Sequence, residues 1–269
     1  MKKNKFKISL IVLIFLSICF VIIGCFKYNS YLKTKANTYY KQGNYYKAYA
    51  LYEKIFIEKF IDIDVLIKKS RSAYRLARYD DCIKNLNSVE KLIMENPQND
   101  YTEEFKTIYG LKGQSYNHLK NYSKCIYYLN KYKELQNDFL IIKIIEPTII
   151  EAYCELNEYD KCIEEINSIL VNKDKFNIKD EFDNHFLFQL YDRLYTCYIE
   201  KDDYNNALLA AKNLINIAPN NIDGYFSTYY IYTKIKDKKY ANEYLLSLKE
   251  IFPNNKTLQS IIKHHIGNN

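Results

Sequence analysis

From residue 30 onward, apolar and polar residues are arranged in a pattern that recurs along the chain. Six windows of 17 residues align without gaps, and each contains a small residue at its tenth position. Apolar residues follow the small residue at four and seven positions, which places all three on one face of a helix. The small residues are Ala48, Cys82, Cys125, Cys162, Ala207 and Ala241.

Tyrosine marks two further positions of these windows. Three residues before the small residue stand Tyr45, Tyr79, Tyr122, Tyr159 and Tyr204, while the last window has Lys238. Nine residues before it stand Tyr39, Tyr116, Tyr153, Tyr198 and Tyr232, while the second window has Ala73. In "KQGNY", Gly43 suits the C-terminus of a helix. Each window therefore predicts a helical hairpin: helix A, a short turn, and a helix B that begins with the small residue.

A single hairpin of this kind leaves an apolar face uncovered, so the hairpins are expected to stack. After Pro253, the segment "NKTLQSIIKHHIG" (255–267) is mildly amphipathic and predicts a helix that covers the last hairpin. We therefore expect an all-α fold: an α-solenoid of about six hairpins over residues 30–254, followed by a C-terminal capping helix and tail over residues 255–269.

Taken together, the six windows resemble the tetratricopeptide repeat (TPR). The small residues are 34, 43, 37, 45 and 34 positions apart, and the first and last intervals match the period of that family. Pro219 and Pro253 stand twelve residues after the small residue, where the proline that ends helix B falls in the family. The resemblance implies that helix A residues line a concave groove that binds an extended peptide or a helix.

Alignment with the family gives candidate residues for this groove. They are Lys33, Asn37, Tyr40, Arg71, Tyr74, Gln114, Asn117, Glu151, Asp192 and Tyr230. The N-terminal half of the set leans basic and the later half leans acidic. Lys33 and Asn37 resemble the start of the family's carboxylate clamp, but Thr107 and Leu111 stand where the clamp has basic residues. The clamp function is therefore not carried over.

A different pattern precedes the repeats. Residues 8–26 carry no charge and follow the basic stretch "MKKNKFK". At about 1.5 Å per residue, this run is long enough to cross a hydrocarbon core of roughly 30 Å. Residues 1–26 thus predict a membrane-anchor helix, with the basic residues cytoplasmic and the repeats on the extracytoplasmic side of the cell membrane.

The same residues also fit a signal peptide. The stretch "IIGC" (22–25) resembles the lipobox of bacterial lipoproteins, which implies that Cys25 receives a lipid after cleavage. Against this, helical sequence resumes by about Ser30, where lipoproteins usually have a flexible tether. An uncleaved transmembrane helix and a lipid anchor both remain open, and both predict a membrane-attached protein of a bacterial cell envelope.

Composition narrows the classes of function. Of the formal net charge of +7, four charges come from Lys2, Lys3, Lys5 and Lys7, and acids and bases are interspersed in the remainder. Nucleic-acid binding needs a clustered basic face, so it is not expected. With only six Gly and four Pro, the chain has few residues for tight turns, which argues against a strand-rich fold.

Candidate chemistry is sparse. Cys82, Cys125 and Cys162 occupy the small-residue position, and Cys154 and Cys197 lie in or near helix A. Because no C-x-x-C pair and no Cys/His cluster at zinc-ligand spacing occurs, the cysteines are expected to be packing residues, and no metal or cofactor is expected. Asp80–Asp81 and Asp202–Asp203 fall near helix B starts, where carboxylates cap helices, and the four histidines form no catalytic motif.

One apolar stretch, "FLIIKIIEP" (139–147), leaves two alternatives. It either packs between repeats three and four or forms an exposed partner-binding patch. Pro147 is either a first-turn proline or the site of a kink. The whole sequence predicts a membrane-anchored scaffold that binds a protein segment and is not an enzyme. A receptor or sensor for a secreted peptide is the alternative, and a cell-envelope enzyme is a third possibility.

Overall fold

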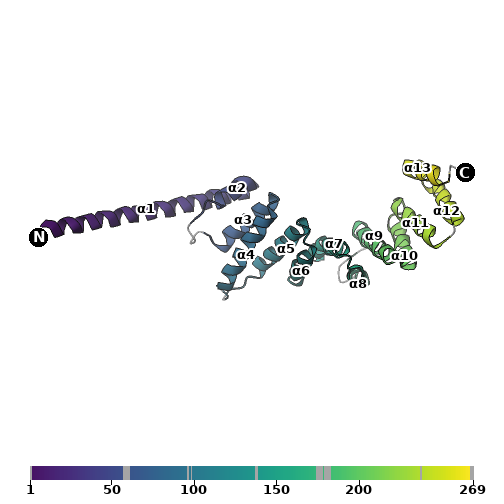
Figure 1. Cartoon of the computed structure of the whole chain (residues 1–269), viewed down its shortest axis with the longest axis horizontal. Coiled ribbons are helices and arrows are strands. Elements are labelled where there is room, and N and C mark those ends of the chain that lie inside the picture. Colours follow the sequence, from purple (N-terminus) through teal and green to yellow (C-terminus); the bar gives the residue numbers. More distant parts are fainter. Residues whose placement is uncertain are drawn as a thin grey trace. The chain divides into compact units, whose positions relative to one another are not determined.

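In the computed structural model, every element in the described part of the chain is an α-helix (Figure 1). The structure describes the backbone of residues 2–56, 61–95, 97, 99–136, 139–173, 178, 183–236 and 238–266. Side chains are described from residue 16 onward within these ranges, except those of residues 17, 139 and 142. The prediction of an all-α fold is confirmed over these residues.

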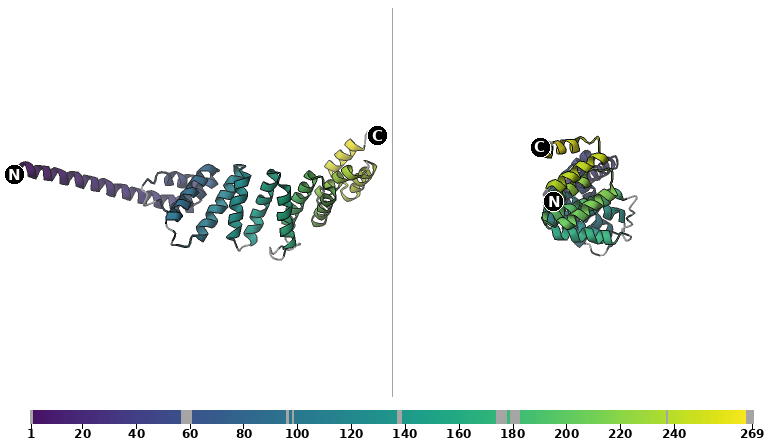
Figure 2. Two further views of the ribbon diagram at one scale, coloured as in Figure 1. Left: turned by 60° about the horizontal axis from the view of Figure 1, so that its bottom comes forward. Right: turned by 90° about the vertical axis from the view of Figure 1, so that its right-hand side faces the viewer.

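The chain divides into two compact units, residues 1–135 and 136–269. The first unit contains α1 (Lys2–Lys41), α2 (Tyr45–Tyr52), α3 (Ile63–Arg75), α4 (Tyr79–Glu95), α5 (Thr102–His118) and α6 (Tyr122–Glu134). The second contains α7 (Phe139–Glu155), α8 (Tyr159–Val171), α9 (Asn184–Glu200), α10 (Tyr204–Ile217), α11 (Asp223–Ile235), α12 (Lys238–Ile251) and α13 (Lys256–His265). Within each unit, helices that follow one another in sequence pack side by side (Figure 2).

Five of the six hairpins share one turn geometry. Five residues before the small residue, the backbone is left-handed at Gly43, Ala77, Lys120, Asn157 and Asp202. In the first hairpin the amide of Asn44 donates to the carbonyl of Tyr39, 2.9 Å away, and the amide of Gly43 donates to that of Tyr40. The other four turns repeat both bonds. This is the Schellman arrangement, which satisfies the last carbonyls of helix A and reverses the chain within three residues.

One detail of the predicted hairpin is wrong. Helix B does not begin with the small residue but three positions earlier, at the recurrent tyrosine in five hairpins and at Lys238 in the sixth. The residue before it caps the helix in several hairpins: the side chains of Asn44, Asn121 and Asp203 each accept a hydrogen bond from the backbone amide three residues on. The small residue therefore lies one turn inside helix B, where it faces the neighbouring helices.

The predicted buried face is confirmed. The six small residues are at most 1% exposed, and the residues four positions later are at most 2% exposed. These side chains form successive apolar clusters. One joins α1, α2 and α3 around Leu32 and Tyr52, and another in the second unit joins α7, α8 and α9 around Ile166 and Leu190. At the C-terminus, α13 packs on α12 through Leu258 and Ile262, as the predicted capping helix requires.

Two predictions on prolines have different outcomes. Pro219 and Pro253 each follow the last residue of a helix B by two positions, as expected. Pro147 lies in the interior of α7, so the first-turn alternative is wrong. The apolar stretch 139–147 lies within this helix, which turns some of its side chains inward and others toward solvent: Ile145 is buried, while Ile144 is 70% exposed. Neither of the two alternatives for this stretch describes all of it.

The predicted anchor belongs to one long helix. α1 has 40 residues, and its C-terminal part packs on α2 and α3 through Leu32 and Ala36, while the Asn29 side chain accepts a hydrogen bond from the amide of Phe56. Before that part, apolar side chains are exposed, with Phe20 at 79% and Val21 at 61%. Among the helices whose side chains are described, none combines the length and apolarity needed to cross a membrane. The side chains of residues 8–15, which form the first part of the predicted anchor, lie outside the described residues.

Candidate functional site

In the first unit, the first helices of successive hairpins are neighbours. α3 contacts both α1 and α5, so the predicted groove residues of these three helices lie on adjacent elements. Contacts between side chains link the helices: the Arg71 guanidinium donates to the Thr107 hydroxyl across 3.1 Å, and the Tyr74 hydroxyl lies 3.4 Å from Nε2 of His118. The helix A positions of the first unit thus form one continuous row.

Lys33 and Asn37, at the N-terminal end of this row, are engaged in structural contacts. The Lys33 ammonium pairs with Asp62, the residue that caps α3. The Asn37 side chain accepts a hydrogen bond of 2.7 Å from the Tyr52 hydroxyl in α2. Both side chains therefore help to hold the first hairpin and α3 together, and this engagement is a second argument against a carboxylate clamp.

The middle of the row is more open. Arg71 is exposed, and Gln114 and Asn117 are half-buried on α5. Tyr74 lies in edge contact with Tyr79 at 5.7 Å between ring centroids, and burial raises the pKa of the Tyr74 phenol. Tyr40 makes the equivalent edge contact with Tyr45. These tyrosines keep their rings against helix B, so a ligand on this face would meet polar groups and ring edges.

In the second unit, three predicted residues lie on α7, α9 and α11. Glu151 and Asp192 line a small cleft of about 100 Å³ between α7 and α9, together with Pro147, Ile150, Gln189, Leu190 and Arg193. A guanidinium nitrogen of Arg193 lies 3.6 Å from a Glu151 carboxylate oxygen. Burial raises the pKa of the Asp192 carboxyl, and the positive charge of Arg193 offsets part of this effect. Tyr230, on α11, is exposed.

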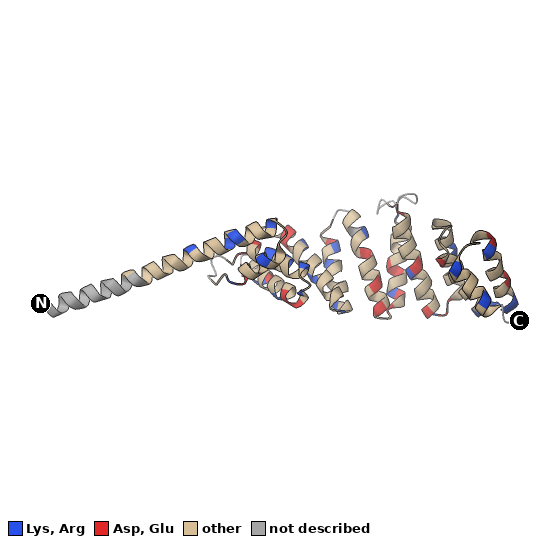
Figure 3. Ribbon diagram, turned by 90° about the horizontal axis from the view of Figure 1, so that it is seen from above, with Lys and Arg blue, Asp and Glu red and all other residues tan. Residues whose placement is uncertain are grey.

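The residues that carry the predicted charge trend lie on the first helices of the hairpins in each unit. Basic Lys33, Arg71 and Arg75 belong to the first helices of the first unit, and acidic Glu151, Asp192 and Asp223 to those of the second. Figure 3 shows acidic positions frequently on α7 to α9, while both signs are interspersed elsewhere. A negatively charged ligand would thus be attracted to the row on the first unit, and a positively charged ligand to the cleft.

The acidic pairs and His118 behave as expected for structural residues. The Asp203 carboxylate accepts from the amide of Asn206 and caps α10. Asp81 pairs with Arg78 at 2.7 Å in the first turn of α4. The His118 ring is exposed and stacks on Tyr79, with 4.4 Å between ring centroids. Each of the groups named here thus takes part in a cap, an ion pair or a ring contact.

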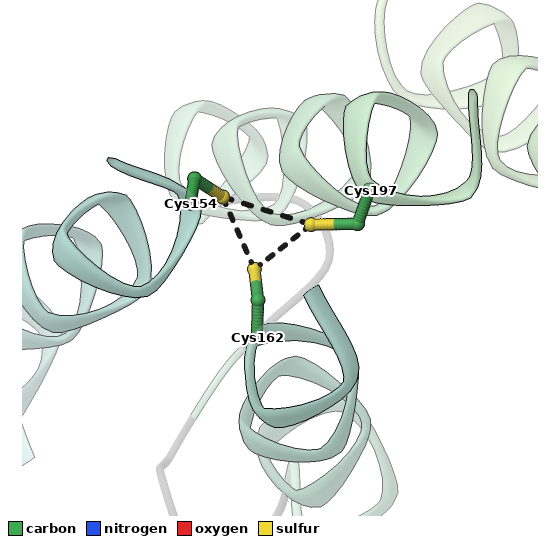
Figure 4. A group of neighbouring side chains, drawn as sticks. All are labelled: Cys154, Cys162 and Cys197. Atoms are coloured by element: carbon green, nitrogen blue, oxygen red, sulfur yellow. Dashed lines mark hydrogen bonds between the residues drawn. The ribbon is translucent and has the colours of Figure 1, made fainter. Parts of the chain in front are cut away.

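Three cysteines come together in a way that the sequence analysis missed. Cys154 of α7, Cys162 of α8 and Cys197 of α9 point their sulfur atoms toward one another (Figure 4). The Sγ–Sγ distances are 3.4 Å, 3.6 Å and 3.1 Å. Cys162 and Cys197 are fully buried, as packing residues would be, but packing alone does not require three sulfurs to meet.

Hydrogen bonds link the three thiols of this cluster. Hydrogen bonds from Cys162 and Cys197 lower the pKa of the Cys154 thiol, while the hydrogen bonds to Cys154 raise the pKa of Cys162 and Cys197. The sequence offered one usable signal. Cys154 and Cys162 flank a hairpin turn, and Cys197 lies in the helix A that follows, so the register of the repeats brings the three together.

Comparison with known proteins supports the fold. No protein-family model matches the chain, and no curated protein matches it in sequence. Among solved structures, YrrB, described as a TPR protein with an unusual peptide-binding site, is 13% identical with a TM-score of 0.51. That alignment covers 79% of this chain and 97% of YrrB.

Two structures of MamA are similar to the same degree. One, labelled MSR-1, is 16% identical over 71% of this chain and 97% of its own, with a TM-score of 0.51. The other is 15% identical over 72% of this chain and 93% of its own, with a TM-score of 0.51. At such identities the likeness concerns the fold alone. Together with the hairpins described above, it shows that this chain has the tetratricopeptide-repeat fold.

Proposed function

We propose that this protein is an interaction scaffold that binds an extended segment of a partner protein along the first helices of its hairpins. The observation that carries the proposal is the continuous row on α1, α3 and α5, in which exposed Arg71 and the amides of Gln114 and Asn117 are presented by rigid, packed helices. A preorganised surface of this kind lowers the entropic cost of binding. The peptide-binding site named for YrrB supports the same class of ligand.

The charge of the row favours a partner segment that carries acidic side chains or a terminal carboxylate. Arg71 is exposed, and a guanidinium can bind a carboxylate through two parallel hydrogen bonds. No catalytic role is part of the proposal, because the titratable groups described above serve caps, ion pairs and ring contacts.

Crosslinking in the native cell envelope tests the binding surface. The tagged protein would be crosslinked, purified and analysed for partners, alongside the double variant Arg71→Ala/Asn117→Ala. Lys84→Ala/Asn87→Ala is a matched control, because it removes one basic residue and one amide from exposed positions of α4. We expect the crosslinked partner to be lost only in the Arg71/Asn117 variant. Equal recovery from both variants would contradict the proposed surface.

We also propose that residues 8–26 attach the protein to the cytoplasmic membrane, with the repeats on the extracytoplasmic side. The uncharged run, the basic residues before it and the exposed apolar side chains of residues 18–23 support this. Attachment by an uncleaved helix and attachment by a lipid on Cys25 lead to the same placement of the repeats.

Fatty-acid labelling separates the two modes of attachment. Incorporation of a labelled fatty acid would be compared between the natural protein, Cys25→Ala and the control Cys19→Ala, which changes a cysteine of the same helix. Label lost only in Cys25→Ala indicates a lipid anchor. An unlabelled protein that stays in alkali-washed membranes indicates a transmembrane helix. Recovery of the natural protein in the soluble fraction would contradict membrane attachment altogether.

A further inference from the structure

The cluster of Cys154, Cys162 and Cys197 is a distinct feature of the second unit. Three different helices supply its members, and each sulfur lies within 3.6 Å of the other two. Cys154 is half-buried, whereas Cys162 and Cys197 have no exposed surface. The sulfurs therefore converge inside the stack of helices, and Cys154 is the member nearest to solvent.

Comparison with other repeats shows that this convergence is not a general result of packing. Cys82 and Cys125 occupy the same position of helix B as Cys162 and are equally buried. In the helix A that follows each of them, the position equivalent to Cys197 is Ser115 or Ala152. A cysteine at the small-residue position thus packs without a second cysteine in two hairpins. Around Cys162, in the fourth hairpin, Cys154 of the same hairpin and Cys197 of the next one add two sulfurs.

We propose that Cys154, Cys162 and Cys197 form a three-sulfur binding site for copper(I). Thiolate sulfur is a soft ligand that selects copper(I), zinc and iron–sulfur clusters over hard cations. Three sulfurs that surround a metal in one plane, each bonded at about 2.3 Å, lie about 4.0 Å apart. The observed Sγ–Sγ distances of 3.4 Å, 3.6 Å and 3.1 Å are shorter, so rotations of the side chains that move the sulfurs apart would be needed to accommodate an ion.

The number of ligands distinguishes between these metals. Within the part of the chain that the structure describes, no fourth cysteine, histidine or carboxylate joins the group. Zinc in proteins is almost always four-coordinate and would need a water molecule at this site. Because two of the three cysteines are fully buried, the site favours an ion that is satisfied by three sulfurs.

Copper binding at this site requires reduced and deprotonated cysteines. Each thiol that binds copper(I) as a thiolate releases one proton, and a cysteine that is oxidised to a disulfide cannot bind.

A competition titration of the full-length chain tests the proposal. The reduced protein would be titrated with copper(I) under anaerobic conditions against a chromophoric copper(I) chelator. Variants Cys154→Ser and Cys197→Ala would be compared with the controls Cys82→Ala and Cys125→Ala, with helical content measured by circular dichroism. Cys19 and Cys25 remain in every variant, so any contribution from them cancels in the comparison.

We expect one copper(I) equivalent to be lost, or its affinity to fall about a hundredfold or more, in the two cluster variants only. X-ray absorption of the copper-loaded protein should show three sulfur neighbours. Equal copper binding in Cys154→Ser and Cys125→Ala, both folded, would overturn the proposal. Tighter binding of zinc than of copper(I), or a lack of copper(I) affinity in the fully reduced protein, would overturn it as well.

Discussion

At the scale of single residues, Lys112 is an unusual component of the first unit. Its side chain is 1% exposed, and its ammonium nitrogen lies 2.6 Å from a carboxylate oxygen of Glu90 and 5.0 Å from the centroid of the Tyr128 ring. Glu90 is 23% exposed. If the ion pair is broken, water can therefore solvate the Glu90 carboxylate more easily than the Lys112 ammonium.

Removing the two partners should have unequal effects. We expect Glu90→Ala to lower the free energy of unfolding by about 3–5 kcal/mol, because it leaves a buried ammonium without its carboxylate. Lys112→Met keeps the aliphatic stem and leaves Glu90 with access to water, so its cost should be smaller. Urea denaturation of both variants measures the difference. A larger cost for Lys112→Met would contradict this explanation of the ion pair.

Asp192 gives a prediction that depends on pH. Burial raises the pKa of its carboxyl in the folded state, so ionisation destabilises the fold at pH values above the unfolded-state pKa of about 4. We expect Asp192→Asn to raise the denaturation midpoint at pH 7, with the gain disappearing as the pH falls toward 3. Glu164→Gln, at an exposed position of α8, is the control. A gain of equal size at pH 3 and pH 7 would show that burial of the Asp192 charge is not the cause.

At the scale of elements, a left-handed turn residue links the helices of five of the six hairpins. Only the first hairpin has glycine at this position, while Ala77 and Lys120 adopt φ of 56° with a side chain present. Left-handed backbone costs a residue with a Cβ atom roughly 1 kcal/mol. The later hairpins therefore hold their turns through the Schellman hydrogen bonds and the packing of the helices.

Exchanging residues between these turns should change stability in opposite directions. We expect Gly43→Ala to destabilise the first unit by about 1 kcal/mol, and Lys120→Gly to stabilise it by a similar or smaller amount, since flexibility of glycine in the unfolded chain offsets part of the gain. Thermal denaturation followed by circular dichroism measures both. The same sign for the two variants would show that the turn conformation does not control the effect.

α5 and α6 approach each other closely at Gly113. A Cβ atom at this position would lie 2.5 Å from Cδ2 and 2.6 Å from Cγ of Leu129. We expect Gly113→Ala to cost about 1–3 kcal/mol through this overlap, and Leu129→Ala about 2–5 kcal/mol through the cavity it leaves. The double variant should cost less than the sum, because the new methyl group enters the space that the leucine vacates.

Gly110 is the matched control for this pair of helices. It lies in the same helix, and a Cβ atom there would meet the Tyr132 ring at 3.5 Å, an ordinary contact. Gly110→Ala should therefore be neutral or stabilising, since alanine favours the helix by up to about 1 kcal/mol. If urea denaturation shows that the costs of Gly113→Ala and Leu129→Ala add in the double variant, the proposed overlap between the two side chains is contradicted.

At the scale of the whole molecule, each hairpin contacts mainly its neighbours, so stability is expected to be local. Leu86→Ala, at a fully buried position of α4, should reduce hydrogen-exchange protection in α3 to α5 and leave α10 to α12 unchanged. Mass spectrometry of peptides from the exchanged protein measures this. A uniform loss of protection across both units would instead indicate a single cooperative fold.

Much of the fold could be predicted because its period is visible in the sequence. The small residue and the apolar residue four positions later are buried in all six hairpins, since helical geometry fixes which positions share a face. The predicted start of helix B is three residues too late, because the small residue marks the closest packing of the helices and not the helix terminus. The left-handed residues Ala77 and Lys120 carry no local signal, since tertiary packing selects their conformation.

The candidate sites could be predicted less completely. The repeat register places Arg71 and Tyr74 on the first helices, but it does not show that Lys33 pairs with Asp62, because that contact joins different elements. The cysteine cluster shows no metal-ligand spacing along the sequence. Cys154 and Cys197 are 43 residues apart, and only the stacking of the hairpins brings them within 3.6 Å.

The 40-residue α1 has a consequence for orientation, because residues 8–26 and the first helix of the repeats belong to one uninterrupted helix. A helix turns by about 100° and rises by about 1.5 Å per residue. Each residue inserted at positions 27–28 would therefore rotate the row of Lys33, Arg71 and Asn117 by about 100° about the axis of α1. Four inserted residues would nearly restore its direction and move it about 6 Å farther from residue 26. The length of this helix thus sets the direction in which the first unit presents the proposed binding row.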